Sequence, residues 1–376
     1  IEKNAISNIF YELYAAINRM KPDIIFTVDY FRPETLEING LYHVCWIQDP
    51  LPHLLDAEKI AKLTSYDLSM SLMLNWNNLE DLYKGENFML GLVPANEDIY
   101  KLYEISPEEY KKYECAVCLV CHDSDYMGNL DRCFSNSDEK LAEASKKIAL
   151  RYYSHVLKDK PLFSEEAFYH FCFPLAKQIL KNLDELQVQK FSKYWAEQML
   201  WLRAPMYRNA LVTWLLEAGV TNIKLWGDGW LNTEFKQYAM GPAENGEKLA
   251  KILQCSKINL GNNSFFTSPG RVFETMLSGG FYLSNYIPEA DDPYPISKVF
   301  IEDEELVFFR NKDDLIKKVK FYLENGEKRQ RMTEIGRQAC LEKMTYKALM
   351  RNMTEKLSEM AAKNLAAAGA KRKEPR

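Results

Sequence analysis

The chain has 376 residues, enough for two domains with substantial cores, and its 47% hydrophobic and 27% charged residues are typical of a folded globular protein. The formal net charge of -5 argues against nonspecific nucleic-acid binding, because a polyanion would meet a mildly acidic surface. No apolar run approaches the about 18 residues that a membrane span needs, and no signal-peptide pattern opens the chain, so we expect a cytoplasmic protein.

The N-terminal part of the chain predicts a parallel sheet wrapped by helices. Residues 5–20 form an amphipathic pattern, and short apolar runs follow at 24–28, 43–50, 68–74 and 88–93, separated by helices or loops. We expect a first α/β domain over residues 1–110 that is shortened by at least one β-α-β unit. A start at Ile1 rather than methionine indicates a fragment or a processed end, so a larger multidomain chain is one interpretation.

The C-terminal part predicts a second α/β domain over residues 111–345. Its strands are expected at 115–120, 222–227, 257–260, 281–286 and 305–310. Helix-forming and aromatic residues fill the interval 134–204, which predicts a helical insertion within this domain. A last helix is expected at 346–363 and a disordered tail at 364–376.

Eight cysteines in a chain without a secretory signal indicate reduced thiols. The spacing of Cys115, Cys118, Cys121 and His122 superficially resembles a zinc or iron–sulfur pattern. The segment is apolar and strand-like, however, and residues three apart in a strand point to opposite faces. We therefore expect buried structural cysteines and no metal site.

The most informative segment runs from Ile258 to Tyr286. An apolar run ends in a polar loop, and Ser268 followed by Pro269 is the start signal of a helix that should run to the Gly279-Gly280 stop. The spacing predicts one apolar stripe and one polar stripe that faces away from the core. The apolar stripe is Val272, Phe273, Met276 and Leu277, and the polar stripe is Arg271, Glu274, Thr275 and Ser278.

A strand, a loop and a helix N-terminus at one sheet edge favour anion binding, because the first amides lack partners. Arg271 adds donors there, and Glu274 can accept hydrogen bonds from two neighbouring ribose hydroxyls. A nucleoside diphosphate fits this arrangement. The alternative is a weak exposed ion pair between residues one helical turn apart.

The run from Ser268 to Glu274, followed by Gly279-Gly280 and a strand, resembles the donor signature of GT-B glycosyltransferases, closest to the CgeB-like (spore-maturation) group of the glycosyl transferases group 1 family. Residues 238–260 and 92–100 resemble further segments of that family. The resemblance implies two Rossmann-like domains facing across a cleft, with the donor in the second domain. It implies transfer of a sugar, as by a hexosyltransferase, from a nucleotide-sugar donor to a protein or glycan acceptor.

The resemblance also assigns residues to the donor. It implies that Glu274 holds the ribose and that the loop before the helix faces the diphosphate and sugar, while the base lies beside residues 238–242. The glycine turn after the strand at 222–227 lies at the same sheet edge, where glycine lets backbone approach a ligand. A plain tight turn is the alternative for both glycine segments. The expected donor-binding residues are Gly227, Gly229, Gly241, Pro242, Ser264, Ser268, Gly270, Arg271 and Glu274.

Candidate catalytic residues lie in the first domain. Asp29 and Asp49 each end a predicted strand, and His53 follows shortly after. An inverting transfer needs a base for the acceptor hydroxyl, so Asp49 and His53 are the candidates, with Asp49 expected to matter more. Helix capping is the alternative role for these aspartates. We expect no cofactor and no metal, because Arg271 and the helix N-terminus neutralise the leaving diphosphate. An inactive glycosyltransferase-like scaffold is the alternative function, and a dinucleotide oxidoreductase is disfavoured because no GxGxxG motif follows a first strand.

Overall fold

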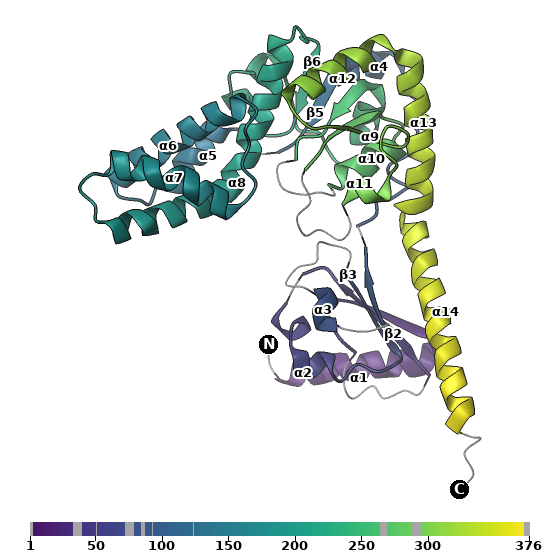
Figure 1. The fold of residues 1–376 in the computed structure, drawn as a ribbon. Helices are drawn as coiled ribbons and strands as arrows, with labels where there is room; N and C mark the ends of the chain where they lie inside the picture. The colour runs from purple at the N-terminus through teal and green to yellow at the C-terminus, as the bar shows by residue number, and fades with distance from the viewer. Residues whose placement is uncertain are drawn as a thin grey trace. The chain divides into compact units, whose positions relative to one another are not determined.

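The structure is a computed structural model that describes residues 3–32, 40–49, 51–71, 79–83, 87–91, 93–122, 124–263, 269–287 and 295–371. The chain divides into two compact units. The first unit consists of Ile1–Pro94 and Tyr346–Arg376, and the second consists of Ala95–Ala290 and Pro295–Thr345. Every paired strand in the described part of both units runs parallel to its neighbour, which confirms the α/β prediction (Figure 1).

The first unit holds a four-stranded sheet in the order β1-β2-β3-β4. Apolar side chains on one face of β2 and β3 pack against α14, and those on the other face of β2 pack against η1 and α3. The helix α14 thus completes the core of this unit although it is the last element of the chain. The bounds are α1 Lys3–Met20, β1 Ile24–Val28, β2 Tyr42–Ile47, η1 Pro52–Leu54, α2 Ala57–Ile60, β3 Asp67–Ser71, α3 Leu79–Tyr83, β4 Phe88–Leu90 and α14 Tyr346–Lys371.

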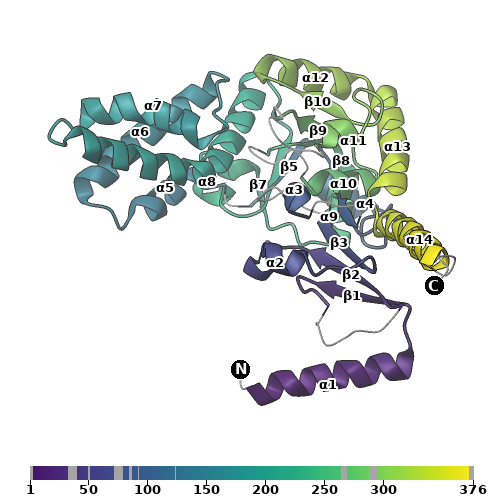
Figure 2. The same ribbon diagram turned by 60° about the horizontal axis from the view of Figure 1, so that its bottom comes forward.

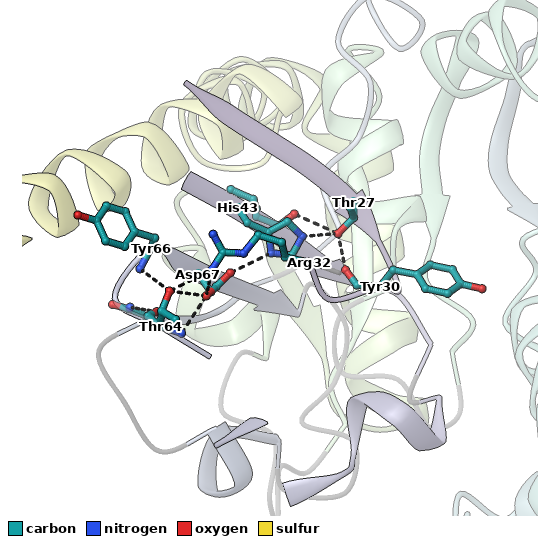
Figure 3. A network of polar contacts seen from close by, with 9 residues as sticks. Thr27, Tyr30, Arg32, His43, Thr64, Tyr66 and Asp67 are labelled. Carbon is teal, nitrogen blue, oxygen red and sulfur yellow. Dashed lines mark hydrogen bonds and ion pairs between the residues drawn. The ribbon is translucent and has the colours of Figure 1, made fainter. Parts of the chain in front are cut away.

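A buried polar network joins three strands of this sheet (Figure 3). His43 on β2 lies between two partners, with its Nε2 2.9 Å from the hydroxyl of Thr27 on β1 and its Nδ1 3.5 Å from Asp67 on β3. The second oxygen of Asp67 accepts hydrogen bonds from Arg32 at 3.0 Å and from the amide and hydroxyl of Thr64 at 2.8 and 2.6 Å. Burial alone would raise the pKa of Asp67, but hydrogen bonds from His43 and Thr64 lower it below its usual value.

The second unit holds a six-stranded sheet in the order β10-β9-β8-β5-β6-β7. Numbered from β5 as the first strand, this is the 3-2-1-4-5-6 order of the Rossmann fold, and the direction of winding reverses between β5 and β8. Open sheets of this type bind ligands in the crevice at the carboxyl ends of the strands beside that reversal. The bounds are β5 Cys115–Val120, β6 Ile223–Trp226, β7 Ala239–Gly241, β8 Ser256–Leu260, β9 Tyr282–Asn285 and β10 Val307–Phe309.

Helices cover both faces of this sheet (Figure 2). One face packs in a single apolar cluster with α8 and α12. The other face meets α9 and α10, where the Asn259 side chain of β8 donates a hydrogen bond to the carbonyl of Leu253 in α9 at 2.9 Å. The bounds are α4 Pro107–Tyr113, η3 Trp230–Asn232, η4 Lys236–Tyr238, α9 Glu247–Cys255, α10 Arg271–Leu277, α11 Ile296–Val299, α12 Lys312–Glu324 and α13 Gly326–Lys343.

The interval between β5 and β6 is helical, as the sequence predicts. Trp195 and Trp214 of α8 are fully buried, and their indole groups donate hydrogen bonds to backbone carbonyls of Ser145 and Leu157 at 3.1 and 3.0 Å. These bonds fix α8 against α6, because a buried indole N–H without a partner would be costly. The bounds are α5 Tyr126–Phe134, α6 Glu139–Leu157, α7 Glu165–Ile179 and α8 Glu185–Glu217.

Several expected boundaries differ from the observed ones. The first unit ends at Pro94 rather than near residue 110, because the backbone of Tyr103 donates to and accepts from the Gln254 amide of α9 at 3.0 Å each. The helix α14 continues to Lys371, so residues 364–371 are helical rather than disordered. Among the described residues, no helix is long and apolar enough to cross a membrane.

Candidate functional site

The helix α10 follows β8 at the carboxyl edge of the second sheet. Its apolar stripe is buried as predicted, and the helix ends at Leu277 with Ser278 as its C-cap, after which Gly279 adopts a left-handed φ of +74°. The predicted polar stripe is only half exposed. Thr275 and Ser278 are fully buried, which corrects the expectation, because each hydroxyl donates to the carbonyl four residues earlier at 2.7 Å and so needs no water.

The other two polar residues of α10 form a half-buried ion pair. Arg271 Nη1 lies 2.7 Å from Glu274 Oε2, and both side chains are about one quarter exposed, at 24% and 23%. Tyr100 lies beside them, and burial together with the charge of Glu274 raises the pKa of Tyr100 to about 12. The pair therefore presents a guanidinium and a carboxylate in a partly desolvated setting, where hydrogen bonds to charged groups are stronger than on an open surface.

The predicted glycine turn lies after β6. Gly227 and Gly229 have φ values of +110° and +90°. A Cβ at Gly227 would lie 1.7 Å from the carbonyl oxygen of Cys121, and a Cβ at Gly229 would lie 2.6 Å from the amide nitrogen of Asp125. Both glycines thus have a structural role, because they let this turn contact the backbone of the loop that follows β5.

This close approach brings two polar side chains together. Asp228, between the two glycines, has its Oδ2 3.5 Å from Nδ1 of His122, which follows β5. Arg208 of α8 donates a hydrogen bond to the backbone carbonyl of His122, and the backbone carbonyl of Asp228 accepts one from the amide of Ser124 at 3.1 Å. Sequence reasoning missed Asp228. The sequence does contain a signal for it, because a carboxylate directly after a predicted strand lies at the sheet edge where open α/β sheets bind ligands.

The segment expected beside a nucleobase is partly a strand. Ala239–Gly241 forms β7 rather than a simple turn, with Gly241 in register with Trp226 and accepting a hydrogen bond from Gly227 at 2.9 Å. Pro242 follows it and is exposed. Gly270 directly precedes α10 in a right-handed helical conformation. Ser264 and Ser268 lie outside the described residues.

The candidate catalytic residues lie together in the first unit, after β1 and β2. Asp29 adopts a left-handed φ of +58°, and its carboxylate accepts hydrogen bonds from the amides of Gln48 and Asp49 at 2.6 and 3.1 Å. His53 Nε2 lies 2.7 Å from the carbonyl oxygen of Asp29. The imidazole also stacks on Tyr30 at 5.3 Å between ring centroids, whereas the side chain of Asp49 is exposed.

All eight cysteines are free thiols, and only Cys133 is not buried. Cys115 and Cys118 on β5 are both buried, and the Sγ of Cys115 donates a hydrogen bond to the Oγ of Ser256 at 3.5 Å. Interaction with the neighbouring Cys118 lowers the pKa of the Cys115 thiol. Among the described residues, no group of three or more His, Cys, Asp or Glu side chains is placed to hold a metal ion.

Part of the chain, mostly in the second unit, matches a known protein family. Residues 203–355 match the family described as "Glycosyl transferase-like". The matched segment runs from within α8 to the first part of α14 and includes the glycine turn and the Arg271–Glu274 pair. No curated protein matches the chain. The family match therefore places a glycosyl transferase-like segment around this pair.

The chain is also similar to solved structures, among them a glycosyltransferase from Rickettsia africae ESF-5, which is 10% identical over 96% of this chain and 82% of that chain, with a TM-score of 0.47. The structure of TarM is 8% identical over 91% of this chain and 57% of that chain, with a TM-score of 0.44. A variant of T4 phage BGT in complex with UDP-glucose is 12% identical over 90% of this chain and 83% of that chain, with a TM-score of 0.39.

Proposed function

We propose that the chain is a GT-B glycosyltransferase that transfers a sugar from a nucleoside-diphosphate sugar to a protein or glycan acceptor. The observation that carries this proposal is the half-buried Arg271–Glu274 pair on α10. It lies at the carboxyl edge of a sheet with Rossmann strand order, inside the segment that matches a glycosyl transferase-like family.

The two charged groups have complementary roles in this proposal. A bound diphosphate accepts hydrogen bonds from the guanidinium of Arg271, because a planar fork of donors suits phosphate oxygens. The carboxylate of Glu274 is then released from the ion pair and accepts hydrogen bonds from the two ribose hydroxyls. Arg271 also stabilises the negative charge of the leaving diphosphate, so the proposed reaction needs no divalent cation.

The remaining predicted residues enter the proposal as donor contacts and as candidate bases. Gly227 and Gly229 keep the turn after β6 small enough for a close approach to a ligand. The donor base and sugar are assigned to Gly241, Pro242, Ser264, Ser268 and Gly270. Asp49 and His53 are the proposed bases for the acceptor hydroxyl.

Binding of nucleoside diphosphates tests the donor assignment. UDP, GDP, dTDP and CDP are titrated by calorimetry into the wild-type protein and into Glu274→Ala. We expect one of them to bind, and we expect Glu274→Ala to weaken that binding by about 1–3 kcal/mol, because a charged acceptor for two hydroxyls is lost. The matched control is Glu166→Ala, which removes an exposed helical glutamate that pairs with His170 one helical turn away, at i, i+4 rather than the i, i+3 spacing of Arg271 and Glu274.

Two results would contradict the donor assignment: no binding of any diphosphate, or an unchanged dissociation constant in Glu274→Ala. Hydrolysis of the matching nucleotide sugars, followed by mass spectrometry with and without EDTA, then separates the two functions. Slow hydrolysis that survives EDTA supports a metal-independent enzyme. Binding without turnover over a range of acceptors supports the inactive scaffold instead.

A further inference from the structure

A cavity of about 180 Å³ lies in the second unit where the helical insertion meets the carboxyl edge of the sheet. The sheet contributes residues that follow β8, β9 and β10, among them Asn263, Tyr286 and Arg310. The insertion contributes the turn after α6 and one side of α8, among them Phe163, Arg203 and Tyr207. The cavity therefore exists only because the insertion closes over this edge.

Specific contacts fix the insertion wall in place. Asp159, in the turn after α6, accepts a hydrogen bond from the amide of Lys312 at the start of α12 at 2.9 Å. The ammonium group of Lys312 pairs with Glu217 at the end of α8 at 2.8 Å. Arg203 is buried and donates to the carbonyl of Phe163 at 2.5 Å, which holds the segment after α6 against α8. The wall is thus attached to α12, which packs on the sheet.

The sheet wall is equally constrained. The side chain of Asn285 at the end of β9 accepts a hydrogen bond from the amide of Asn263 at 3.1 Å and donates one to the carbonyl of the same residue. It thereby fixes the start of the loop that leads from β8 to α10. Next to it, the ring of Tyr286 is covered on one side by the guanidinium of Arg310 at 4.7 Å from the ring centroid. The cavity consequently borders the loop that precedes the donor helix.

The chemistry of the cavity fits a neutral polar group. Arg310 is paired with Glu302, which lies outside the lining, through two hydrogen bonds of 2.5 and 2.7 Å, and the other charged lining residues are Arg203 and Asp159. These two guanidinium groups and two carboxylates sum to zero formal charge, so the site has no net positive charge to favour a phosphate. Its volume is below the roughly 300–1,000 Å³ of pockets for drug-sized ligands, so a whole nucleotide does not fit. Aromatic rings and carboxamides together suit a ring that has both apolar C–H groups and hydroxyls.

We propose that this cavity binds one monosaccharide residue and that the helical insertion sets which sugar the enzyme accepts. This inference rests on the proposed function and extends it, because the family match begins at residue 203 and so leaves most of the insertion outside it. The bound ring is either the sugar of the donor or a terminal sugar of the acceptor. A donor sugar and an acceptor sugar have the same chemistry. They differ in whether the cavity is filled when the donor binds or when the acceptor binds.

The test compares Tyr286→Ala and Phe163→Ala with the control Trp201→Ala. The first two truncate rings of the cavity lining, while Trp201 is an aromatic residue of α8 that is 73% exposed and not part of the lining. Each protein is titrated with UDP, GDP, dTDP and CDP, with their glucose and N-acetylglucosamine conjugates, and with methyl glycosides of both sugars, with and without diphosphate. We expect both cavity variants to weaken sugar binding about tenfold, because apolar contact with an aromatic ring is lost, and the control to have no effect.

The outcomes distinguish the two sources. If the donor sugar fills the cavity, the variants weaken binding of the conjugates but not of the diphosphate. If the acceptor sugar fills it, they weaken binding of the methyl glycosides and leave both donor forms unchanged. Unchanged binding of conjugates and glycosides alike, or equal loss in Trp201→Ala, overturns the inference even when the diphosphate binds normally. Failure of the diphosphate itself to bind to the wild type would instead contradict the proposed function.

Discussion

The hydrogen bond between His53 and the backbone of Asp29 decides which imidazole nitrogen is basic. Because a carbonyl oxygen only accepts, Nε2 of His53 donates to it, and the neutral ring then has its lone pair on Nδ1. Stacking on Tyr30 fixes the orientation of the ring. Asp49, by contrast, has an exposed side chain and is held through its backbone, where the amide donates to the Asp29 carboxylate at 3.1 Å and the carbonyl accepts from the Leu51 amide at 2.8 Å. At the scale of single residues, His53 is therefore a better positioned base than Asp49. The sequence had predicted the opposite order, because His53 lies on a loop.

Replacement of each residue tests this ranking. We expect His53→Ala to lower the turnover of sugar transfer to a soluble acceptor by roughly 10²- to 10⁴-fold, since the proton of the acceptor hydroxyl loses its base. Asp49→Asn should have a smaller effect, and the dissociation constant of the donor should stay constant in both variants. His170→Ala, which changes an exposed histidine of the insertion, serves as the control. Full turnover in His53→Ala would show that the base is another group.

At the scale of elements, periodicity predicted most strands well because a parallel sheet buried on both faces needs continuous apolar runs. The run 115–120 gives β5 with the expected bounds. The burial of the Thr275 and Ser278 hydroxyls, by contrast, was missed. These hydroxyls form hydrogen bonds to backbone carbonyls of their own helix and so can be buried without water. A hydrophobicity pattern carries no information about such bonds.

The network around Asp67 makes a prediction about the first sheet, because it joins β1, β2 and β3. We expect Asp67→Asn to lower the free energy of unfolding at pH 7 by roughly 3 kcal/mol, since the half-buried Arg32 then lacks its carboxylate partner and an amide group faces the donors of Thr64. Urea unfolding of both proteins measures this difference. As a control, Asp131→Asn removes the exposed partner of Lys146 and should cost no more than about 1 kcal/mol.

The pH dependence of this difference follows from the lowered pKa of Asp67. A carboxyl group whose pKa is lower in the folded than in the unfolded protein stabilises the fold above its unfolded pKa of about 3.9. That contribution is lost as the pH falls through the folded pKa. The wild type and Asp67→Asn should therefore converge in stability below about pH 4. A difference that stays constant down to pH 3 would contradict the network as the source of the effect.

At the scale of the whole molecule, the sequence predicted two α/β units but misplaced their boundary. In its described residues, the segment between the first sheet and β5 contains no strand, and its assignment depends on the contacts of Tyr103 with Gln254, which lie far apart in the sequence. The return of α14 to the first unit was equally hidden. Its apolar residues gave a helix, but only the three-dimensional structure shows that they cover β2 and β3. Sequence motifs located the Arg271–Glu274 pair on α10, whereas the cavity between the insertion and the sheet could be found only in the three-dimensional structure.

Because the chain divides into two units, the donor proposal predicts which unit a bound nucleotide protects from hydrogen exchange. If the donor binds at α10 and the glycine turn, a saturating nucleoside diphosphate should slow hydrogen exchange in the second unit, in the segments 121–122, 227–241 and 269–280, and should leave β1 to β3 unchanged. At about 100 times the dissociation constant, the stabilisation of the binding unit amounts to about 2.7 kcal/mol. Hydrogen exchange followed by mass spectrometry of peptides resolves the two units in one experiment. In Glu274→Ala at the same ligand concentration the protection should decrease across all three segments together, because the proposed donor site includes residues of each. Protection confined to the first unit, or protection that Glu274→Ala leaves intact, would mean that the nucleotide binds away from α10.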